Sequence, residues 1–497
     1  MYVSYNFTYH LATVAHCCDV GRQVTIDMLP DVALLEIFDC YVKQAREEED
    51  DGAEPLKIQE WHTLVHVCRH WRAIVLGSPR RLGLRLFCTD KTLVKETLAV
   101  WPPLPIVITQ YSEETQMDNI IVALEHNERI CQIDLLGVTS SQLEEVLPAM
   151  QQPFPALTDL AIWLSDWDDR SLADVPPPVV PESLLGGSAP RLQDLHLERI
   201  PFPGLPNLLL TATNLVSLYI LEIPHSGYIS PEEMVRCLST LTRLESLWLG
   251  FESPLSRPVR VTRRLHPPTR STLPALTFFG FRGVSEYLEV LVARVDAPLL
   301  DNSNITFFHQ LIFDTPQLAQ FLARTPTILS LVGAHIIFSD GHVVVKFPQT
   351  QFPRGFELEV RCKQSDWQLS SLAQVCSSSF PQVLIRMVEH LHISEGYGRP
   401  RWQDDIEGSQ WLEALRPFTA LKHLHVSREF LPRIAPAFQE LAGEPVTEVL
   451  PALQSLFLEE VNPSGPVREA MDKFVTARHL AGHPITVSHW DRKQDMQ

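Results

Sequence analysis

The stretch that decides the fold is residues 192–197, LQDLHL, in which apolar residues stand at the first, fourth and sixth positions. Its last part alternates between apolar and polar residues, as a β-strand with one buried face does. The same spacing begins again at residue 215 (LVSLYI), residue 244 (LESLWL) and residue 276 (LTFFGF). Further copies begin at residues 130, 157, 388, 421 and 453. A strand that recurs in this way predicts a repeated structural unit.

Helices fit between several of these strands. Ser230, Pro231 and Glu233 have the form of a helix start: a capping hydroxyl, a proline at the first helical position and an acid three residues after the cap. A similar start at residues 314–316 opens a segment that runs to about residue 323. Strands that alternate with helices predict an α/β solenoid with a parallel sheet inside its bend.

The array resembles leucine-rich repeats, whose units run about 20–29 residues and share this strand pattern. It departs from the family in its uneven spacing, since the copies at 192, 215, 244 and 276 lie 23, 29 and 32 residues apart. The longer gaps must therefore hold inserted loops. The asparagine expected after each strand is also missing, and in its place stand Ile200, Ile223, Glu252 and Val284.

The repeat cannot be followed from residue 284 to residue 387. Within that part, residues 335–347 predict a β-hairpin, because Asp340-Gly341 is a typical tight-turn pair between two apolar runs. An α/β domain rich in leucine but of another kind therefore stays an alternative to the solenoid.

A different, helical pattern precedes the repeats. Pro30 suits the first position of a helix and Asp31 complements its dipole. Leu34, Ile37, Phe38 and Tyr41 then follow at helical spacing, before an acidic interruption at residues 46–55. The helical pattern resumes with Trp61, Leu64, Val67, Cys68, Trp71 and Ile74, and stops at residues 77–79.

These helices resemble the F-box, a motif that docks on the Skp adaptor of cullin-based ubiquitin ligases. Leu-Pro at residues 29–30 and Val-Cys-Arg-x-Trp-Arg at residues 67–72 carry the resemblance. Residues 61–86 are also similar to F-box proteins of mushroom-forming fungi. An acidic insertion at about residues 44–59 departs from the compact motif. The resemblance implies that the adaptor is bound, directly or through the helices they support, by Leu29, Pro30, Leu34, Ile37, Phe38, Val67, Cys68 and Trp71.

We therefore expect an N-terminal extension (1–27), an F-box (28–82), a leucine-rich-repeat-like solenoid (83–460) and a C-terminal tail (461–497). Polar and aromatic residues that alternate with buried ones would point out of the sheet and bind a target protein there. Some could instead lie under inserted loops. The expected target-binding residues are Trp163, His196, Tyr219, Trp248, Arg282, His425 and Phe457.

Composition limits the partners and the compartment. The formal net charge is −19, which disfavours nucleic acid and anionic membranes as partners. The arginines at residues 257, 260, 263 and 264 are interpreted as a solvated loop. Nine cysteines without a CxxC pair predict reduced thiols. With no signal peptide and no membrane-spanning run in the sequence, we expect an intracellular protein, cytoplasmic or nuclear.

No motif nominates an enzyme, a metal or a cofactor. His62, His66 and His70 lie four residues apart, but no second pair of ligands accompanies them. The expected function is that of a substrate-recognition adaptor in a Skp–cullin–F-box ubiquitin ligase. Two alternatives remain: a repeat protein whose F-box engages an adaptor outside any ligase, and a repeat protein whose N-terminal helices only cap the solenoid.

Overall fold

The computed structural model describes residue 26 and residues 29–47, 61–110, 117–165, 177–255, 270–308, 312–348, 355–363, 367–396, 408–443, 448–459 and 465–491. The contacts divide the chain into two compact units, Met1–Leu86 with Val100–Pro105, and Phe87–Ala99 with Ile106–Gln497. The expected N-terminal extension apart from residue 26, most of the acidic insertion and the arginine-rich segment 257–264 lie outside the described residues.

The first unit is helical, with α2 (Asp31–Glu47), α3 (Trp61–Val67) and α4 (Arg69–Gly77). Leu34, Phe38 and Val42 are buried one turn apart along α2, which packs against α3 and α4. The rings of Phe38 and Trp71 lie 4.7 Å apart. Cys68 caps α4, its sulfur accepting a hydrogen bond from the backbone N–H of Trp71 at 3.4 Å. Leu34 and Phe38 of the predicted apolar stripe therefore lie in the core of this unit, whereas Ile37 and Tyr41 of the same stripe are exposed.

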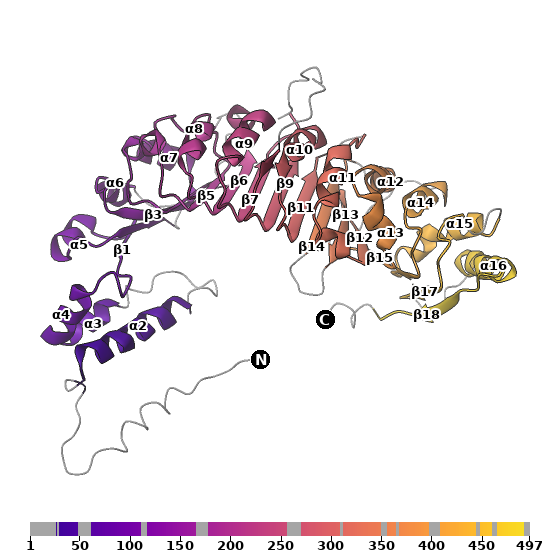
Figure 1. Ribbon diagram of the computed structural model, residues 1–497, viewed down its shortest axis with the longest axis horizontal. Helices are drawn as coiled ribbons and strands as arrows, with labels where there is room; N and C mark the ends of the chain where they lie inside the picture. The colour runs from indigo at the N-terminus through magenta and orange to yellow at the C-terminus, as the bar shows by residue number, and fades with distance from the viewer. Residues whose placement is uncertain are drawn as a thin grey trace, which may run out of the picture. The chain divides into compact units, whose positions relative to one another are not determined.

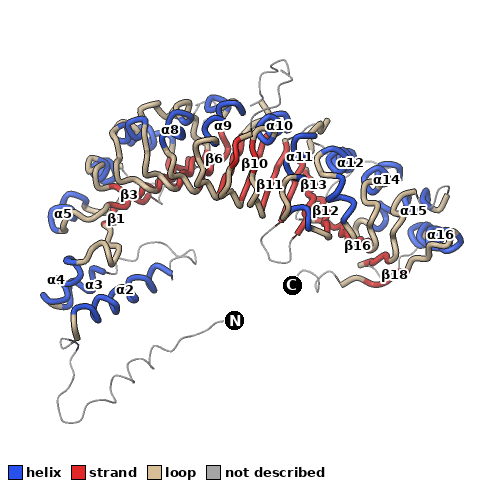
Figure 2. The backbone as a smooth tube through the Cα atoms, in the orientation of Figure 1, coloured by secondary structure: helices blue, strands red, loops and turns tan. Residues whose placement is uncertain are grey.

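The second unit is built on one long sheet with helices on one face (Figure 1). Among the described residues the sheet has 16 strands, in the order β1-β2-β3-β4-β5-β6-β7-β9-β11-β14-β13-β12-β15-β16-β17-β18. The sheet bends with its helix-free face on the inner side (Figure 2). A separate pair joins β8 (Ser271–Thr272) to β10 (Val295–Asp296). The strands of the long sheet are β1 (Leu86–Thr89), β2 (Ile106–Gln110), β3 (Ile130–Val138), β4 (Asp159–Leu164), β5 (Asp194–Glu198), β6 (Ser217–Ile223), β7 (Ser246–Phe251), β9 (Phe278–Gly283), β11 (Asn302–Phe307), β12 (Gly333–Ser339), β13 (His342–Pro348), β14 (Gly355–Arg361), β15 (His390–Glu395), β16 (His423–Val426), β17 (Ser455–Leu458) and β18 (Thr486–His489).

The helices cover the outer face of this sheet, each packing on the next from α8 to α11 and again along α12, α14, α15 and α16. Ser230 caps α9 as predicted, accepting from the backbone N–H of Glu233 at 3.3 Å. The helix after Thr315 starts differently: the Glu289 carboxylate accepts from the backbone N–H groups of Gln317 and Leu318, at 2.9 and 2.8 Å. The helices of this unit are α5 (Val94–Val100), α6 (Asp118–Leu124), α7 (Ser140–Val146), α8 (Leu205–Thr211), α9 (Pro231–Leu238), α10 (Ser285–Val292), α11 (Pro316–Ala323), α12 (Gln368–Ser378), α13 (Gln382–Met387), α14 (Gly408–Leu415), α15 (Leu431–Leu441) and α16 (Pro466–Leu480).

The core lies between the sheet and these helices. Its side chains stack in register from strand to strand, as in the row Ile162, Leu197, Ile220, Leu249 and Phe281, all at most 2% exposed. Each strand contributes one such buried side chain, and together they form a continuous apolar row. This row stabilises the array, although no single repeat could bury its own apolar face. All nine predicted copies of the pattern are strands, and the mixed α/β class with a long parallel sheet is confirmed.

The long sheet is parallel except where strand β13 pairs with its two neighbours. The hairpin at residues 335–347 is confirmed as β12 and β13, with Gly341 at a φ of +77° in its turn. Strand β14 then pairs antiparallel with β13 and parallel with β11. The strand order in this part of the sheet is therefore β11-β14-β13-β12, and the parallel repeats resume where β12 pairs with β15. Strand β13 thus runs against its neighbours, which explains why the repeat cannot be followed in the sequence there.

The sheet also continues beyond residue 460, where the sequence predicts a tail. Strand β18 pairs with β17, and α16 packs on α15. Arg478 of α16 is fully buried and donates hydrogen bonds to the carbonyls of Leu450, Pro451 and Leu453, at 3.4, 3.4 and 3.0 Å. Burial lowers the pKa of this guanidinium, and the three carbonyls accept from its Nη1 and Nη2 atoms. A buried arginine therefore fixes this last helix.

Candidate functional site

The helix-free face of the sheet carries the residues that the alternation predicted to point outward. In its middle row, His196, Tyr219, Trp248 and Gly280 stand in register on β5, β6, β7 and β9. The same row ends in His335, His392, His425 and Phe457. Gly280 is buried and the other residues of this row are half-buried, whereas Trp163 on β4 is 41% exposed. The structure brings all seven expected target-binding residues onto one face.

The first part of this face, over β3 to β6, is acidic and hollowed. A cavity of about 240 Å³ opens there, with Ala161 on its floor. Burial raises the pKa of Asp134, a hydrogen bond from Gln132 opposes that rise, and the nearby Asp159 adds to it. The cavity is lined by Gln132, Asp134, Asp159, Leu160, Ala161, Asp194, Leu195, His196, Ser217 and Tyr219.

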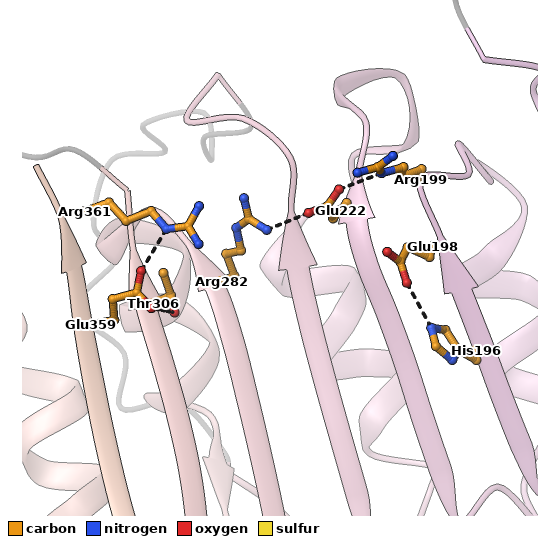
Figure 3. A network of polar contacts seen from close by, with 8 residues as sticks. All are labelled: His196, Glu198, Arg199, Glu222, Arg282, Thr306, Glu359 and Arg361. Atoms are coloured by element: carbon orange, nitrogen blue, oxygen red, sulfur yellow. Dashed lines mark hydrogen bonds and ion pairs between the residues drawn. The ribbon is translucent and has the colours of Figure 1, made fainter. Parts of the chain in front are cut away.

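A carboxylate between two arginines occupies the next part of the face (Figure 3). Glu222 accepts from Arg199 Nε at 2.7 Å and from Arg282 at 2.8 Å. Burial alone would raise the pKa of Glu222, but the bonds and charges of Arg199 and Arg282 outweigh it and hold that pKa below its ordinary value. Arg282 also lies over the ring of Phe308, 5.8 Å from its centroid. Arg282 is therefore held in a network and is less available to a partner than its sequence position predicts.

Further ion pairs follow on β13 and β14. Lys346 pairs with Glu357 at 2.9 Å, across adjacent strands. Arg361 pairs with Glu359 at 2.9 Å, and Glu359 also accepts from Thr306 at 3.5 Å (Figure 3). The middle of the face therefore carries charges of both signs that already neutralise one another.

The last part of the face is a stack of aromatic rings. His392 lies 4.5 Å from His335 and 4.1 Å from His425, and His425 lies 4.4 Å from Phe457, as centroid distances. Trp490 meets His392 and His425 edge-on, at 5.5 and 5.3 Å. Burial, and then the neighbouring histidines His425, His335 and His390, lower the pKa of His392 to about 3. His392, at the centre of the stack, is therefore uncharged at neutral pH.

In the helical unit, the residues expected to contact an adaptor fall into three groups: buried, exposed and half-buried. Leu34 and Phe38 are buried in the core of the unit, so they support the helices rather than meet a partner. Ile37 and Val67 are 44% and 56% exposed. Pro30 is also exposed, while Leu29, Cys68 and Trp71 are half-buried. Val32 and Tyr41, which the expected set omits, are exposed on α2 as well.

The histidines of the helical unit have partners other than a metal. His62 stacks on Trp101 with the ring centroids 4.4 Å apart, and burial together with His66 lowers its pKa to about 4. His70 lies 3.2 Å from Asp31. Among the described residues, three potential metal ligands converge at Glu395, Glu429 and Glu459, whose carboxylates lie within 4.8 Å of one another. Glu395 accepts from Ser427 there, at 2.6 Å.

Three features of the face were not predicted from the sequence. Trp490 lies in the segment predicted as a tail, so no strand pattern placed it beside the histidines. Glu222 has a positive φ of 49° and stands just outside the alternating part of β6. The hollow depends on Ala161, and an alanine carries no chemical signal of its own. The aspartates of the three repeats around it were the signal that could have indicated an acidic site.

The comparisons with known proteins add little to this geometry. No protein-family model matches the chain, and no curated protein matches it. A solved structure of the leucine-rich repeat-containing protein LegL7 from Legionella pneumophila is similar over 79% of this chain and 97% of its own, with 12% identity and a TM-score of 0.28. In the part of the chain that the structure describes, no helix is both long enough and apolar enough to cross a membrane. All seven cysteines of that part are free thiols.

Proposed function

We propose that this chain is a substrate-recognition adaptor of a Skp–cullin–F-box ubiquitin ligase. The observation that carries the proposal is the division of the apolar residues of α2 and α3. Leu34 and Phe38 are already covered by the unit's own helices, and Ile37 and Val67 are left exposed. Single exposed apolar residues are common, but a contiguous patch of them marks a docking surface, and exposed Val32 and Tyr41 on α2 add to Ile37 and Val67 in this unit. The resemblance of these helices to the F-box is what points to a Skp-type adaptor as their partner.

The sheet unit supplies the second half of this function. Its helix-free face presents aromatic and charged side chains over many strands, a composition that suits protein recognition. A target held on this face and an adaptor held on α2 and α3 would share one chain. Ubiquitin transfer to the target then becomes effectively intramolecular, without a catalytic residue on this protein.

The test is co-purification of the full chain with a purified Skp-type adaptor. The informative variant is Ile37→Asp combined with Val67→Asp, because both side chains are exposed and the fold should survive the change. Val383→Asp serves as the matched control, since Val383 is also exposed (58%) but belongs to α13. We expect the wild type and the control to retain the adaptor and the double variant to lose it.

Two results would go against the proposal. If the wild-type chain does not retain the adaptor, the helices are not an F-box. If the wild-type chain retains the adaptor but the complex of the two never recruits a cullin, the protein works outside a ubiquitin ligase. This second result corresponds to the first alternative given by the sequence, a repeat protein whose F-box engages an adaptor outside any ligase.

A further inference from the structure

The hollow on the first part of the sheet face has a simple origin. Asp134, Ala161 and His196 stand in register on β3, β4 and β5, in one row of outward-pointing residues. Alanine lacks the bulk of its two neighbours, so the face is recessed above it. Tyr219 continues the row on β6, and its ring lies 5.9 Å from that of His196. The recess therefore has an acidic side at Asp134 and an aromatic side at His196 and Tyr219.

The charge around this hollow is one-sided. Asp159 and Asp194 are paired in register on β4 and β5 and complete its lining with Asp134. Among the residues that the structure describes, no lysine or arginine lines the hollow, and none occurs in β2, β3, β4, β5 or β6. The carboxylates farther along these strands are different, because Glu222 pairs with two arginines and Glu198 lies 3.5 Å from His196.

The arrangement suits an organic cation better than a metal ion. A metal needs carboxylate oxygens that converge on one point. Among the described residues such convergence occurs at Glu395, Glu429 and Glu459, not at the aspartates of the hollow. Spaced carboxylates beside aromatic rings match an ammonium or guanidinium group, which donates several hydrogen bonds and is attracted to ring faces. The volume of about 240 Å³ leaves room for such a group with its aliphatic stem.

We propose that this hollow receives an arginine or lysine side chain from an extended segment of the target protein. The inference rests on the proposed function, because it names the chemistry that the recognition face selects. Asp134, Asp159 and Asp194 bind the cationic head, and Tyr219 and His196 flank its stem. Trp163 lies two residues beyond Ala161 on the same strand and is 41% exposed, so it offers an apolar contact to a neighbouring residue of the same segment.

The experiment uses the purified full chain and labelled nine-residue peptides of glycine and serine with one central residue. The central residue is arginine, lysine, citrulline or glutamate. The positions on either side of it carry large apolar residues, about the size of tryptophan, in place of glycine or serine, in order to add affinity. We expect arginine or lysine peptides to bind and citrulline and glutamate peptides to bind at least about tenfold more weakly, because the charge-assisted bonds are lost. The ratio of arginine to lysine tells which cation the hollow prefers.

Three variants locate the binding. Asp194→Asn removes one charge and should weaken the arginine peptide about tenfold. Ala161→Leu fills the hollow without changing its charge and should abolish the preference for a cation. Glu357→Gln is the control, because Glu357 belongs to the same row but lies on β14 in an ion pair with Lys346.

The inference is overturned if the cationic peptides bind no better than citrulline. It is equally overturned if Glu357→Gln weakens binding as much as Asp194→Asn, since the attraction would then be that of the whole acidic protein. Adaptor co-purification on the same preparations separates the two proposals. A chain that retains the adaptor but shows no cation preference contradicts only this inference, whereas cation preference without adaptor binding contradicts the proposed function.

Discussion

His392 and His425 stack almost parallel on the adjacent strands β15 and β16, with ring centroids 4.1 Å apart and an angle of 11° between the planes. His335 stacks on the other side of His392, and Trp490 meets both of the first two rings edge-on. Two imidazolium rings in this geometry would repel each other, so the stack holds together only while its centre is neutral. We therefore expect the stability of the end of the sheet to depend on pH.

We expect the free energy of unfolding to fall as the pH is lowered from about 6.5 towards 3. The pKa of His392 is lowered to about 3 in the folded chain, from an ordinary value of 6.5. As the pH falls, His392 is therefore protonated in the unfolded chain before it is protonated in the folded chain. Its contribution to the free energy of unfolding is complete above the ordinary pKa of 6.5 and decreases below that pH. For one such group, the free energy of unfolding falls by at most about 1.4 kcal/mol per pH unit. Urea unfolding at pH 7.5 and pH 5.0 measures the difference.

The His392→Phe variant keeps a ring in the stack but cannot take up the proton. Its loss of stability between the two pH values should be smaller than that of the wild type by up to about 2 kcal/mol. His483→Phe, at an exposed position, is the control and should behave as the wild type does. Equal losses in all three proteins would contradict the assignment of the pH dependence to His392.

Arg478→Met should destabilise the end of the sheet by about 2 kcal/mol or more, because two buried carbonyls and one part-buried carbonyl lose their donor. Arg468→Met on the same helix is the control, since Arg468 is exposed and pairs only loosely with Asp472, at 3.7 Å. Its cost should stay within about 0.5 kcal/mol. Thermal unfolding measures both, and equal effects would show that α16 is not anchored through Arg478.

Gly280→Ala should displace Trp248 from the sheet face. A Cβ atom at residue 280 would lie 2.5 Å from the indole ring of Trp248, closer than any real contact. We expect a cost of about 1–3 kcal/mol and a change in tryptophan emission. Gly333→Ala is the matched control, because Gly333 also points outward from a strand and a Cβ there meets nothing within 4 Å. An unchanged spectrum in Gly280→Ala would mean that the indole does not cover residue 280.

Two neighbouring substitutions on α2 should differ sharply. Leu34→Ala removes a fully buried side chain and should cost about 2–5 kcal/mol in the helical unit, while Ile37→Ala should cost within about 0.5 kcal/mol. Hydrogen exchange of residues 61–77 in the full chain reports the opening of α3 and α4. If Ile37→Ala speeds exchange as much as Leu34→Ala does, Ile37 belongs to the core and is not part of a docking surface.

Much of the strand architecture could be predicted because the pattern is local. Positions such as Leu195 and Leu197 alternate with Asp194 and His196 within one strand, and burial of one face is enough to impose that alternation. The start of α9 at Ser230 was predictable for the same reason, since a cap depends on a few adjacent residues. The crossing β11-β14-β13-β12 could not be predicted, because the order of strands depends on pairings between distant segments.

The sequence by itself determined the repeated strands, the mixed α/β class and the outward position of residues such as Trp163 and Tyr219, all of which follow from the period of a strand. Only the tertiary structure decided that Glu222 joins Arg199 to Arg282, that Trp490 reaches His392, and that Ala161 leaves a hollow among three aspartates. The physical reason is distance along the chain. Alternation is settled between neighbouring residues, whereas each of these features brings together side chains from segments far apart in the chain and exists only once the strands are in register.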